Sequence, residues 1–235
     1  MDVQESISWT YDTQGHKIID MIKLDPNISE YIINKPFRPD YNDTSVEDKP
    51  IKFKYDPYHH LWKALDNTAS YGIYCKIDPS YQYPINVGTQ YFVIGKTWLI
   101  LLYSSSYKLY YLQAVNSDFK CVHRYPLNHI NQKSYSIGSN SKSNFIIETD
   151  TTISSSHVRL EADIEKGMFT IRDCESTNGT FIQINEMELK NSNYIFRIGL
   201  ETFMTYSREP IPFKDYSQDS NTNCTTDKDN HTHNN

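Results

Sequence analysis

The most informative part of this sequence is residues 153–184, which read ISSSHVRLEADIEKGMFTIRDCESTNGTFIQI. It contains three short runs rich in β-branched and aromatic residues, separated by the turn signals Glu-Lys-Gly and Ser-Thr-Asn-Gly. Such runs, bounded by glycine and asparagine, are typical of strands joined by tight turns. The expected strands are His157–Asp163, Met168–Asp173 and Thr180–Ile184.

The same pattern extends in both directions from this stretch. Turn signals recur about every 8–12 residues, a spacing typical of an antiparallel sandwich or barrel rather than of βαβ units. The predicted fold class is therefore all-β, an antiparallel sandwich or barrel. The further expected strands are Tyr71–Ile77, Tyr83–Val87, Tyr91–Ile94, Trp98–Tyr103, Lys108–Val115, Phe119–Arg124, Ser134–Ile137, Phe145–Ile147, Tyr194–Ile198 and Thr202–Tyr206.

The remaining sequence divides the chain into four parts. Residues 1–56 lack sustained periodicity and are interrupted by prolines, which predicts an extended N-terminal arm. Residues 57–133 are expected to form a short helix and a β-rich segment, and residues 134–213 the core sandwich. Residues 214–235 are almost wholly polar, which predicts a disordered tail.

The short helix is expected after Asp56. This residue can act as an N-cap, and Pro57 suits the first helical position because its missing N–H costs nothing there. Apolar residues then follow at the spacing of an amphipathic helix: Tyr58, Leu61, Trp62 and Leu65.

Residues 83–94 and 194–205 resemble one another. Both begin with tyrosine and have an aliphatic residue before a glycine, Gly88 in the first and Gly199 in the second. Two interpretations are open. Either both are generic hairpins, or residues 57–133 are a degenerate counterpart of the core sandwich.

Composition excludes several classes of protein. The longest apolar run, Tyr91–Tyr103, is interrupted by Lys96 and is too short for a transmembrane helix, which needs about 18–20 residues. The acidic N-terminus is unlike a signal peptide. The net charge of −6, with no basic stripe, argues against nucleic acid. We therefore expect an intracellular protein, cytoplasmic or nuclear, with a cytoskeletal or other large assembly as one setting.

The four cysteines lie about fifty residues apart without a CxxC pair, which argues against a zinc ribbon and a disulfide scaffold. No metal site and no cofactor is predicted. Catalysis is not expected either: Cys174 and His157 have no visible orienting partner, and no paired carboxylates or Walker loop occurs.

Four motifs follow one another in the core sandwich. Ile137-Gly138 ends a strand, Ser154-Ser-Ser-His157 precedes the next one, Ser176-Thr-Asn-Gly-Thr180 joins two strands, and a hairpin closes at Gly199. This order resembles the forkhead-associated (FHA) family, over roughly residues 134–207. The resemblance implies a β-sandwich that binds phosphothreonine peptides through loops at one end and is not enzymatic.

The resemblance also implies roles for individual residues. Ser154 would hold the phosphate with its hydroxyl, the backbone of Ser155 would add a donor, and Thr177 would contact the phosphate. Asn178 would hydrogen-bond to the peptide backbone. The residues expected to shape and support these loops are Gly138, His157, Ser176 and Gly179.

One departure from the family pattern concerns the phosphate. The residue after Gly138 is an arginine in the family, whereas here it is Ser139. An arginine–phosphate contact contributes roughly 1.5–3 kcal/mol, so its loss predicts weakened binding. Lys142, in the same loop, could substitute in part as a point charge.

Two functions remain open at this stage. The first is a scaffold or complex subunit that binds protein partners with a weakened phosphothreonine site. The second is a fully competent phosphothreonine-dependent adaptor. Both involve protein partners, and neither involves nucleic acid or a membrane.

Overall fold

Every regular element in the described residues is a β-strand, and these residues contain no helix. The computed structural model describes residues 5–10, 18–34, 49–67, 69–127, 133–190, 193–199 and 202–208. The strands are β1 (Glu5–Thr10), β2 (Ile18–Leu24), β3 (Glu30–Ile33), β4 (Ile51–Asp56), β5 (Leu61–Asp66), β6 (Ile73–Lys76), β7 (Tyr83–Pro84), β8 (Tyr91–Ile94), β9 (Thr97–Ser104), β10 (Leu109–Val115), β11 (Cys121–Pro126), β12 (Ser134–Gly138), β13 (Phe145–Ile146), β14 (Val158–Asp163), β15 (Met168–Asp173), β16 (Thr180–Ile184), β17 (Glu186–Glu188), β18 (Asn193–Ile198) and β19 (Thr202–Ser207).

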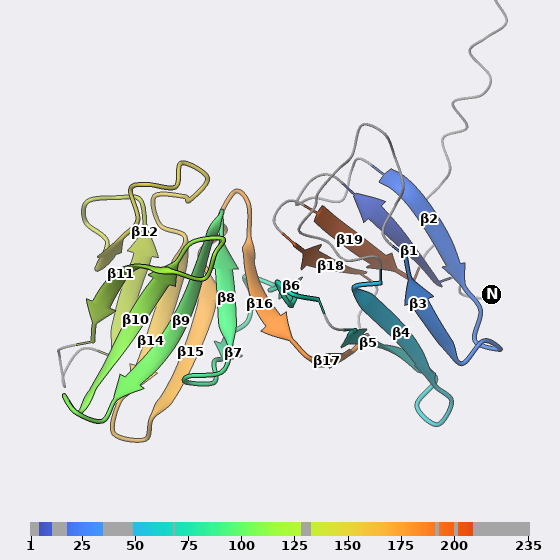
Figure 1. Cartoon of the computed structure of the whole chain (residues 1–235), viewed down its shortest axis with the longest axis horizontal. Coiled ribbons are helices and arrows are strands. Elements are labelled where there is room, and N and C mark those ends of the chain that lie inside the picture. Colours follow the sequence, from blue (N-terminus) through green and yellow to red (C-terminus); the bar gives the residue numbers. More distant parts are fainter. Residues whose placement is uncertain are drawn as a thin grey trace, which may run out of the picture.

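These strands form two sandwiches that share one ten-stranded sheet (Figure 1). The shared sheet has the order β11-β10-β9-β8-β16-β6-β18-β19-β1-β2. One half packs on the four-stranded sheet β17-β5-β4-β3 and forms the first sandwich. The other half packs on the five-stranded sheet β13-β12-β14-β15-β7 and forms the second sandwich. The prediction of an all-β fold with antiparallel sheets is confirmed.

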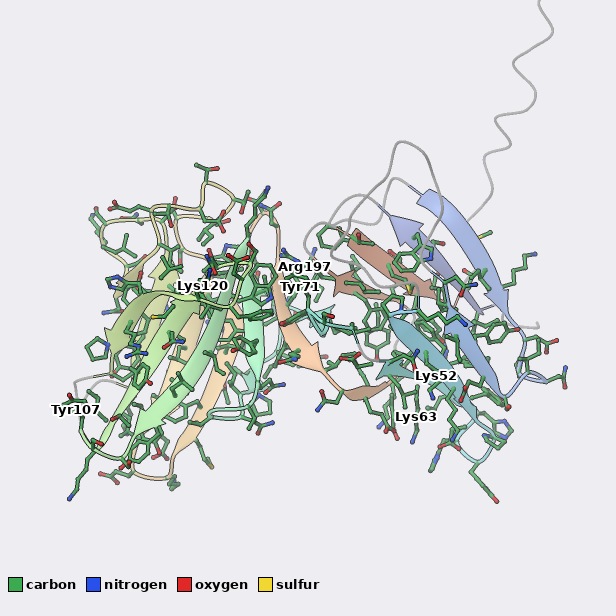
Figure 2. All side chains as sticks on the ribbon, in the orientation of Figure 1. Lys52, Lys63, Tyr71, Tyr107, Lys120 and Arg197 are labelled. Carbon is green, nitrogen blue, oxygen red and sulfur yellow. The ribbon has the colours of Figure 1, made fainter. Side chains whose placement is uncertain are left out.

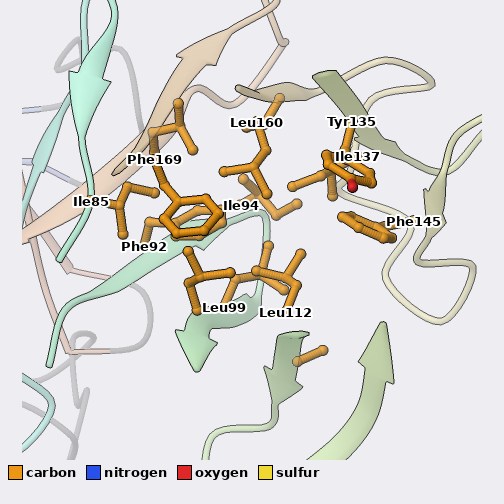
Figure 3. Packing of buried hydrophobic residues seen from close by; sticks show 14 of the residues in the cluster. Ile85, Phe92, Ile94, Leu99, Leu112, Tyr135, Ile137, Phe145, Leu160 and Phe169 are labelled. Carbon is orange, nitrogen blue, oxygen red and sulfur yellow. The ribbon is translucent and has the colours of Figure 1, made fainter. Parts of the chain in front are cut away.

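Each sandwich has its own apolar core. In the first, Trp9, Phe53, Trp62 and Phe196 are almost fully buried among aliphatic residues. In the second, Phe92, Leu112, Tyr135, Leu160 and Phe169 pack between the sheets (Figure 3). Burial of large aromatic and aliphatic side chains at this density is the main stabilising contribution to such a fold.

The two sandwiches are copies of one structural repeat. Residues 51–77 align without a gap with residues 158–184, and Asp66 and Gly72 fall on Asp173 and Gly179. Gly72 and Gly179 both have a φ of 76°. Asp66 accepts a hydrogen bond from the backbone N–H three residues later (2.8 Å), and Asp173 does the same (2.8 Å).

The strand orders match as well. The order β2-β1-β19-β18-β6 in the first sandwich corresponds to β11-β10-β9-β8-β16 in the second. In the facing sheets, β3-β4-β5-β17 corresponds to β12-β14-β15-β7. Along the chain, β1–β9 therefore form repeat one and β10–β19 form repeat two.

The repeats have exchanged their closing strands. Repeat one contributes β1–β6 to the first sandwich but sends β7–β9 into the second. Repeat two contributes β10–β16 to the second sandwich and returns β17–β19 to the first. The second sandwich is thus one continuous segment, β7–β16, whereas the first is built from both ends of the chain. The similarity of residues 83–94 and 194–205 does not follow this correspondence, because the first range contains β7 and β8 whereas the second contains β18 and β19.

The short helix predicted within residues 57–66 is wrong. Asp56 Oδ1 does accept hydrogen bonds from the backbone N–H groups of Tyr58 (3.0 Å) and His59 (3.2 Å), as an N-cap would. However, His60 then takes a φ of 51°, in the left-handed region. The bonds therefore close a turn between β4 and β5 instead of opening a helix.

The apolar residues expected on one face of the helix lie instead in β5 or in the turn before it. Trp62 and Ala64 are both fully buried in the first core, two residues apart, as alternation in a strand requires. Tyr58, which would have belonged to the helical stripe, is 91% exposed.

The described residues of the predicted N-terminal arm form β1–β4 instead of lying extended on the surface. Pro26 falls in the turn after β2, and Pro50 directly precedes β4, so neither interrupts a strand. Pro36 and Pro39 lie outside the described residues, as does the predicted tail of residues 214–235.

Candidate functional site

Three loops meet at one end of the second sandwich, at the upper end of its lobe in Figure 1. They connect β12 to β13, β13 to β14, and β15 to β16. We call residues 152–156 the serine loop and residues 174–179 the threonine turn. All the residues that the sequence predicted for the site lie in or beside these loops.

His157 joins the serine loop to the threonine turn from inside the protein. It is fully buried. Its Nδ1 accepts a hydrogen bond from the backbone N–H of Ser154 (3.0 Å), and its Nε2–H donates to the carbonyl of Gly179 (3.1 Å). Burial lowers the pKa of His157, and the hydrogen bond to Gly179 only partly offsets this effect. His157 is therefore neutral at pH 7 and acts as a structural link.

Ser154 and Thr177 bring two hydroxyl groups together near the surface. The backbone N–H of Thr177 donates to Ser154 Oγ (3.1 Å), and Ser154 Oγ donates to Thr177 Oγ1 (3.4 Å). Thr177 is exposed and Ser154 is half-buried. Hydroxyl protons rotate to suit an acceptor, so this pair can turn donors toward an anion.

Asn178 and Ser139 hold the backbone of the serine loop. Asn178 Nδ2 donates to the carbonyl of Thr152 (2.8 Å), and Ser139 Oγ donates to the carbonyl of Ile153 (3.1 Å). Within the described residues, the amide oxygen of Asn178 has no hydrogen-bond donor. An acceptor at this position suits a backbone N–H of a bound peptide.

Gly138 permits a close approach between β12 and the serine loop. A Cβ atom at this position would lie 2.2 Å from the carbonyl oxygen of Ser155, a distance that no side chain can tolerate. The same oxygen accepts hydrogen bonds from the backbone N–H of Asn140 (3.2 Å) and from Ser143 Oγ (3.3 Å). The side chain of Ser155 is exposed.

Lys142 is the cation that the sequence suggested for the site. It is exposed in the same β12–β13 connection, where its backbone N–H donates to Asn140 Oδ1 (2.8 Å) and closes a turn. Its flexible side chain extends from the rim of the site, without the fixed geometry of a guanidinium at position 139.

The threonine turn is held by the buried carboxylate of Asp173. This carboxylate accepts hydrogen bonds from the backbone N–H of Ser176 (2.8 Å), from Ser176 Oγ (2.7 Å) and from Thr180 Oγ1 (2.5 Å). Ser176 Oγ in turn accepts from the backbone N–H of Gly179 (3.0 Å). Asp173 was not predicted as a site residue, although it directly precedes the threonine turn.

Sequence reasoning also missed Asp150, which anchors the serine loop to the exchanged β8–β9 turn. One carboxylate oxygen accepts from the backbone N–H of Lys96 (2.6 Å) and from Thr97 Oγ1 (3.0 Å). The other accepts from the backbone N–H (3.0 Å) and the hydroxyl of Thr152. Burial acts to raise the pKa of Asp150, but these hydrogen bonds outweigh it and hold the pKa below its ordinary value.

Arg197 links this turn to the first sandwich. It lies on β18 and is 4% exposed, and its Nη1 donates to the carbonyl of Gly95 (2.5 Å). Its guanidinium also stacks over the ring of Trp98, at 5.0 Å from the ring centroid. Tyr71 packs against the same ring, and Tyr71 and Arg197 both lie at the junction between the lobes (Figure 2).

The described residues of the first sandwich do not repeat the site's side chains. By the repeat alignment, Pro50 replaces His157, Ala69 replaces Ser176, and Tyr71 replaces Asn178. Tyr71 packs against Trp98 and Phe119 of the second sandwich instead of facing solvent as a ligand-binding residue. This turn of the first sandwich therefore serves as an interface between the two sandwiches.

A surface depression of about 1090 Å³ adjoins the loops on the side of β10 and β11. Its lining is mixed: Trp98 and Val115 are apolar, Lys96 is basic, and Glu148 is acidic. In the described part of the chain, no group of His, Cys, Asp and Glu side chains is arranged to hold a metal ion.

The loops thus bring two hydroxyl groups and the amide oxygen of Asn178 together at one end of the second sandwich. Residues 135–199 match the sequence profile of the FHA domain. This match confirms the resemblance found in the sequence. A search of curated proteins found no match to the chain.

FHA domains are protein-interaction modules that typically bind phosphothreonine peptides and are not catalytic, which supports protein partners for this part of the chain. The match begins in β12 and ends after β18. It therefore includes strands of both sandwiches, and the strands that close the sandwich bearing the loops lie outside it. In the described residues, no helix is long and apolar enough to cross a membrane.

Proposed function

We propose that the chain is a non-catalytic scaffold or complex subunit whose second sandwich binds phosphothreonine peptides with weakened affinity. The observation that carries this proposal is the convergence of Ser154 Oγ with the hydroxyl and backbone N–H of Thr177 at an exposed apex. The two hydroxyls can rotate to donate to phosphate oxygens, and the amide oxygen of Asn178 can accept from the peptide backbone.

Weakened affinity follows from Ser139. Its hydroxyl donates inward to the carbonyl of Ile153, so this residue offers the phosphate neither a positive charge nor its hydroxyl proton. Charge-assisted hydrogen bonds are roughly twice as strong as neutral ones, and the position next to Gly138 lacks one. Because Ala69 and Tyr71 replace Ser176 and Asn178 in the first sandwich, we expect one peptide per chain.

A fully competent adaptor is the alternative. It requires a cation other than residue 139 near the serine loop, and the exposed Lys142 is in the same loop. An enzyme has less support, because both ring nitrogens of His157 are engaged by backbone groups and cannot act as a base. Cys174 Sγ lies 4.0 Å from the carbonyl of Arg172 and has no base beside it in the described residues.

The test is Ser139→Arg in the full chain, titrated calorimetrically against a degenerate phosphothreonine peptide library. We expect the unmodified protein to bind weakly and the variant to bind about tenfold more tightly or better, through a charge-assisted pair. The gain should vanish with unphosphorylated peptides, and also when Ser154→Ala or Asn178→Ala is added.

Ser105→Arg is the matched control, because it adds the same charge to an exposed turn between β9 and β10, away from the loops. It should not change binding. Tight binding by the unmodified protein would favour the competent adaptor. Absence of binding by both the unmodified protein and Ser139→Arg, with the fold intact, would refute a phosphothreonine site.

A further inference from the structure

Two arginines lie directly opposite each other on the outer face of the second sandwich. Arg159 of β14 is in register with Arg172 of β15. Their neighbours Val158, Leu160 and Ile171 are fully buried in the core, so the two arginines point away from it. Like charges at directly opposed positions of antiparallel strands are destabilising.

Neither arginine is neutralised within the described part of the chain. No ion pair or side-chain hydrogen bond involves Arg159 or Arg172 among those residues. Glu161 lies two residues after Arg159 in β14, but its carboxylate accepts a hydrogen bond from Ser134 Oγ (3.1 Å).

The first sandwich provides an internal comparison. On its equivalent sheet face, Lys52 contacts Glu30 (3.5 Å), and Lys63 contacts Glu186 (3.4 Å) and Glu188 (3.7 Å). Two of these carboxylates come from the exchanged strand β17. The equivalent exchanged strand in the second sandwich, β7, has no carboxylate because it consists of Tyr83 and Pro84. Lys52 and Lys63 are thus paired with carboxylates, although Lys54, directly opposite Lys63, has no ion pair among the described residues; Arg159 and Arg172 are both unpaired there.

The arginines also lie next to the candidate site. Arg159 is two residues beyond His157, which directly follows the serine loop, so it is about 7 Å along the strand from His157. Arg172 directly precedes Asp173, which holds the threonine turn. A peptide that leaves the serine loop along β14 would pass both guanidinium groups.

We propose that Arg159 and Arg172 form a binding surface for acidic side chains that flank the phosphothreonine of the partner. This inference rests on the proposed function and names the partner as an acidic phosphopeptide. The arginines supply, beside the phosphate subsite, cations that Ser139 does not provide. An extended peptide advances about 3.3 Å per residue, which places the acidic residues roughly two to four positions from the phosphothreonine.

The experiment compares three peptides on the full chain: a phosphothreonine peptide with Glu and Asp flanks, the same peptide with Gln and Asn flanks, and the acidic peptide without phosphate. Binding is measured for the unmodified protein, Arg159→Gln, Arg172→Gln and the double variant. Ser139→Arg serves as a second background in which phosphate binding is strengthened.

The matched control is Lys133→Gln with Lys166→Gln, which removes two positive charges near the end of β14 that is away from the serine loop. Both lysines are exposed, and Lys166 lies in the turn between β14 and β15. Because the net charge changes equally in both double variants, a difference between them reports position rather than total charge.

We expect the double arginine variant to lose about tenfold or more in affinity for the acidic phosphopeptide, and less than about twofold for the neutral one. The lysine control should change neither by more than about twofold. An equal loss on the acidic and neutral peptides, or no loss, would overturn the proposal. So would failure of the acidic phosphopeptide to bind in both backgrounds.

The outcomes also separate this proposal from the proposed function. If phosphorylation has no effect on binding but binding of the acidic flanks still requires the arginines, the phosphothreonine site is refuted and the arginine surface for acidic side chains remains. If phosphate is required for binding but the acidic flanks make no difference, the phosphothreonine site remains and the proposed role of the arginines is refuted.

Discussion

Ser8 of β1 lies directly opposite Thr205 of β19, although these residues belong to different repeats. Repeat one has its own closing strand, β9, which pairs instead with β10 of repeat two. The pairing of Ser8 with Thr205 is therefore a direct signature of strand exchange. The exchange also makes the second sandwich, which bears the candidate site, depend on β7–β9. These strands end more than thirty residues before the FHA match begins.

Cross-linking can test this exchange. Opposed residues of antiparallel strands have Cα atoms about 4.5–5.5 Å apart, within the range that a disulfide spans. Ser8→Cys with Thr205→Cys should therefore form a disulfide within one chain under mild oxidation, in a background in which the exposed Cys121 is replaced by serine. Non-reducing electrophoresis and peptide mass mapping provide the measurement.

The control pair is Ser8→Cys with Ile100→Cys. Ile100 occupies in β9 the position that Thr205 occupies in β19, so it would face Ser8 if the strands were not exchanged. This pair should not cross-link. A cross-link here would contradict the exchange, and a covalent dimer from the first pair would show that strands are exchanged between two copies.

The loops and their residues could be predicted from the sequence because their chemistry is local. Ser154, His157 and Asn178 fall in short motifs that fix both turn geometry and hydrogen bonding. The β-strands of the second half were evident for a similar reason, since each is a compact apolar run between turn residues.

The exchange could not be predicted, because it concerns which sheet a closing strand joins. β7–β9 carry the same apolar pattern in either sandwich, so the pattern does not select between them. The repeat itself was also hard to detect. Most equivalent positions keep only their burial, as Trp62 and Phe169 do. The helix prediction failed because the apolar residues after Asp56 fit both a helical and a strand period, and tertiary packing chose the strand.

Gly95→Ala should impair the serine loop. A Cβ atom here would lie 2.3 Å from Thr152 Oγ1 and 2.8 Å from Asp150 Oδ2, and the φ of 56° adds backbone strain. We expect the amide protons of Thr152, Ser154 and Thr177 to exchange with solvent about three- to tenfold faster, as the loss of about one hydrogen bond would produce. Hydrogen exchange monitored by NMR provides the measurement.

Gly88→Ala distinguishes the effect of backbone strain from the effect of the clash with Thr152 and Asp150, because it should produce only the strain. Gly88 also has a left-handed φ of 79°, but a Cβ atom there would have no neighbour within 4 Å. Gly88→Ala should lower the free energy of unfolding by about 1–2 kcal/mol through backbone strain. It should not selectively speed exchange of the amides of Thr152, Ser154 and Thr177. Equal effects of both variants on these amides would contradict the anchoring role of the exchanged turn.

His157 should make stability fall at acidic pH. Its pKa is lowered in the folded protein by burial, so below the ordinary value of 6.5 the unfolded chain binds the proton more readily. The free energy of unfolding should fall as the pH drops below 6.5, at up to about 1.4 kcal/mol per pH unit, until the folded pKa is reached. This contribution is fully present above that range.

Urea unfolding at pH 7.5 and 5.5 measures this dependence. His157→Gln should be less stable at pH 7.5, because the links to Ser154 and Gly179 are weakened, but should lose less stability on acidification. A pH dependence identical to that of the unmodified protein would mean that other groups account for it.

Asp173→Ala and Asp66→Ala form a matched pair across the two repeats. Asp173 accepts three hydrogen bonds around the threonine turn, and Asp66 accepts the equivalent of the first of them, from Ala69 N–H, in the corresponding turn of the first sandwich. Each net hydrogen bond contributes about 0.5–1.5 kcal/mol, and a buried donor left without a partner costs more. We expect Asp173→Ala to lower the free energy of unfolding by about 2–4 kcal/mol and Asp66→Ala by about 1 kcal/mol.

The two variants should differ more sharply in peptide binding. Asp173→Ala releases Ser176 and thereby the position of Thr177, so phosphothreonine binding in the Ser139→Arg background should fall at least tenfold. Asp66→Ala changes a turn whose Tyr71 contacts the other sandwich and no ligand, so binding should change less than about twofold. Calorimetric titration at a temperature where both variants are fully folded makes the comparison. Equal losses would place the first sandwich's turn in the binding site, against the assignment of a single site to the second sandwich.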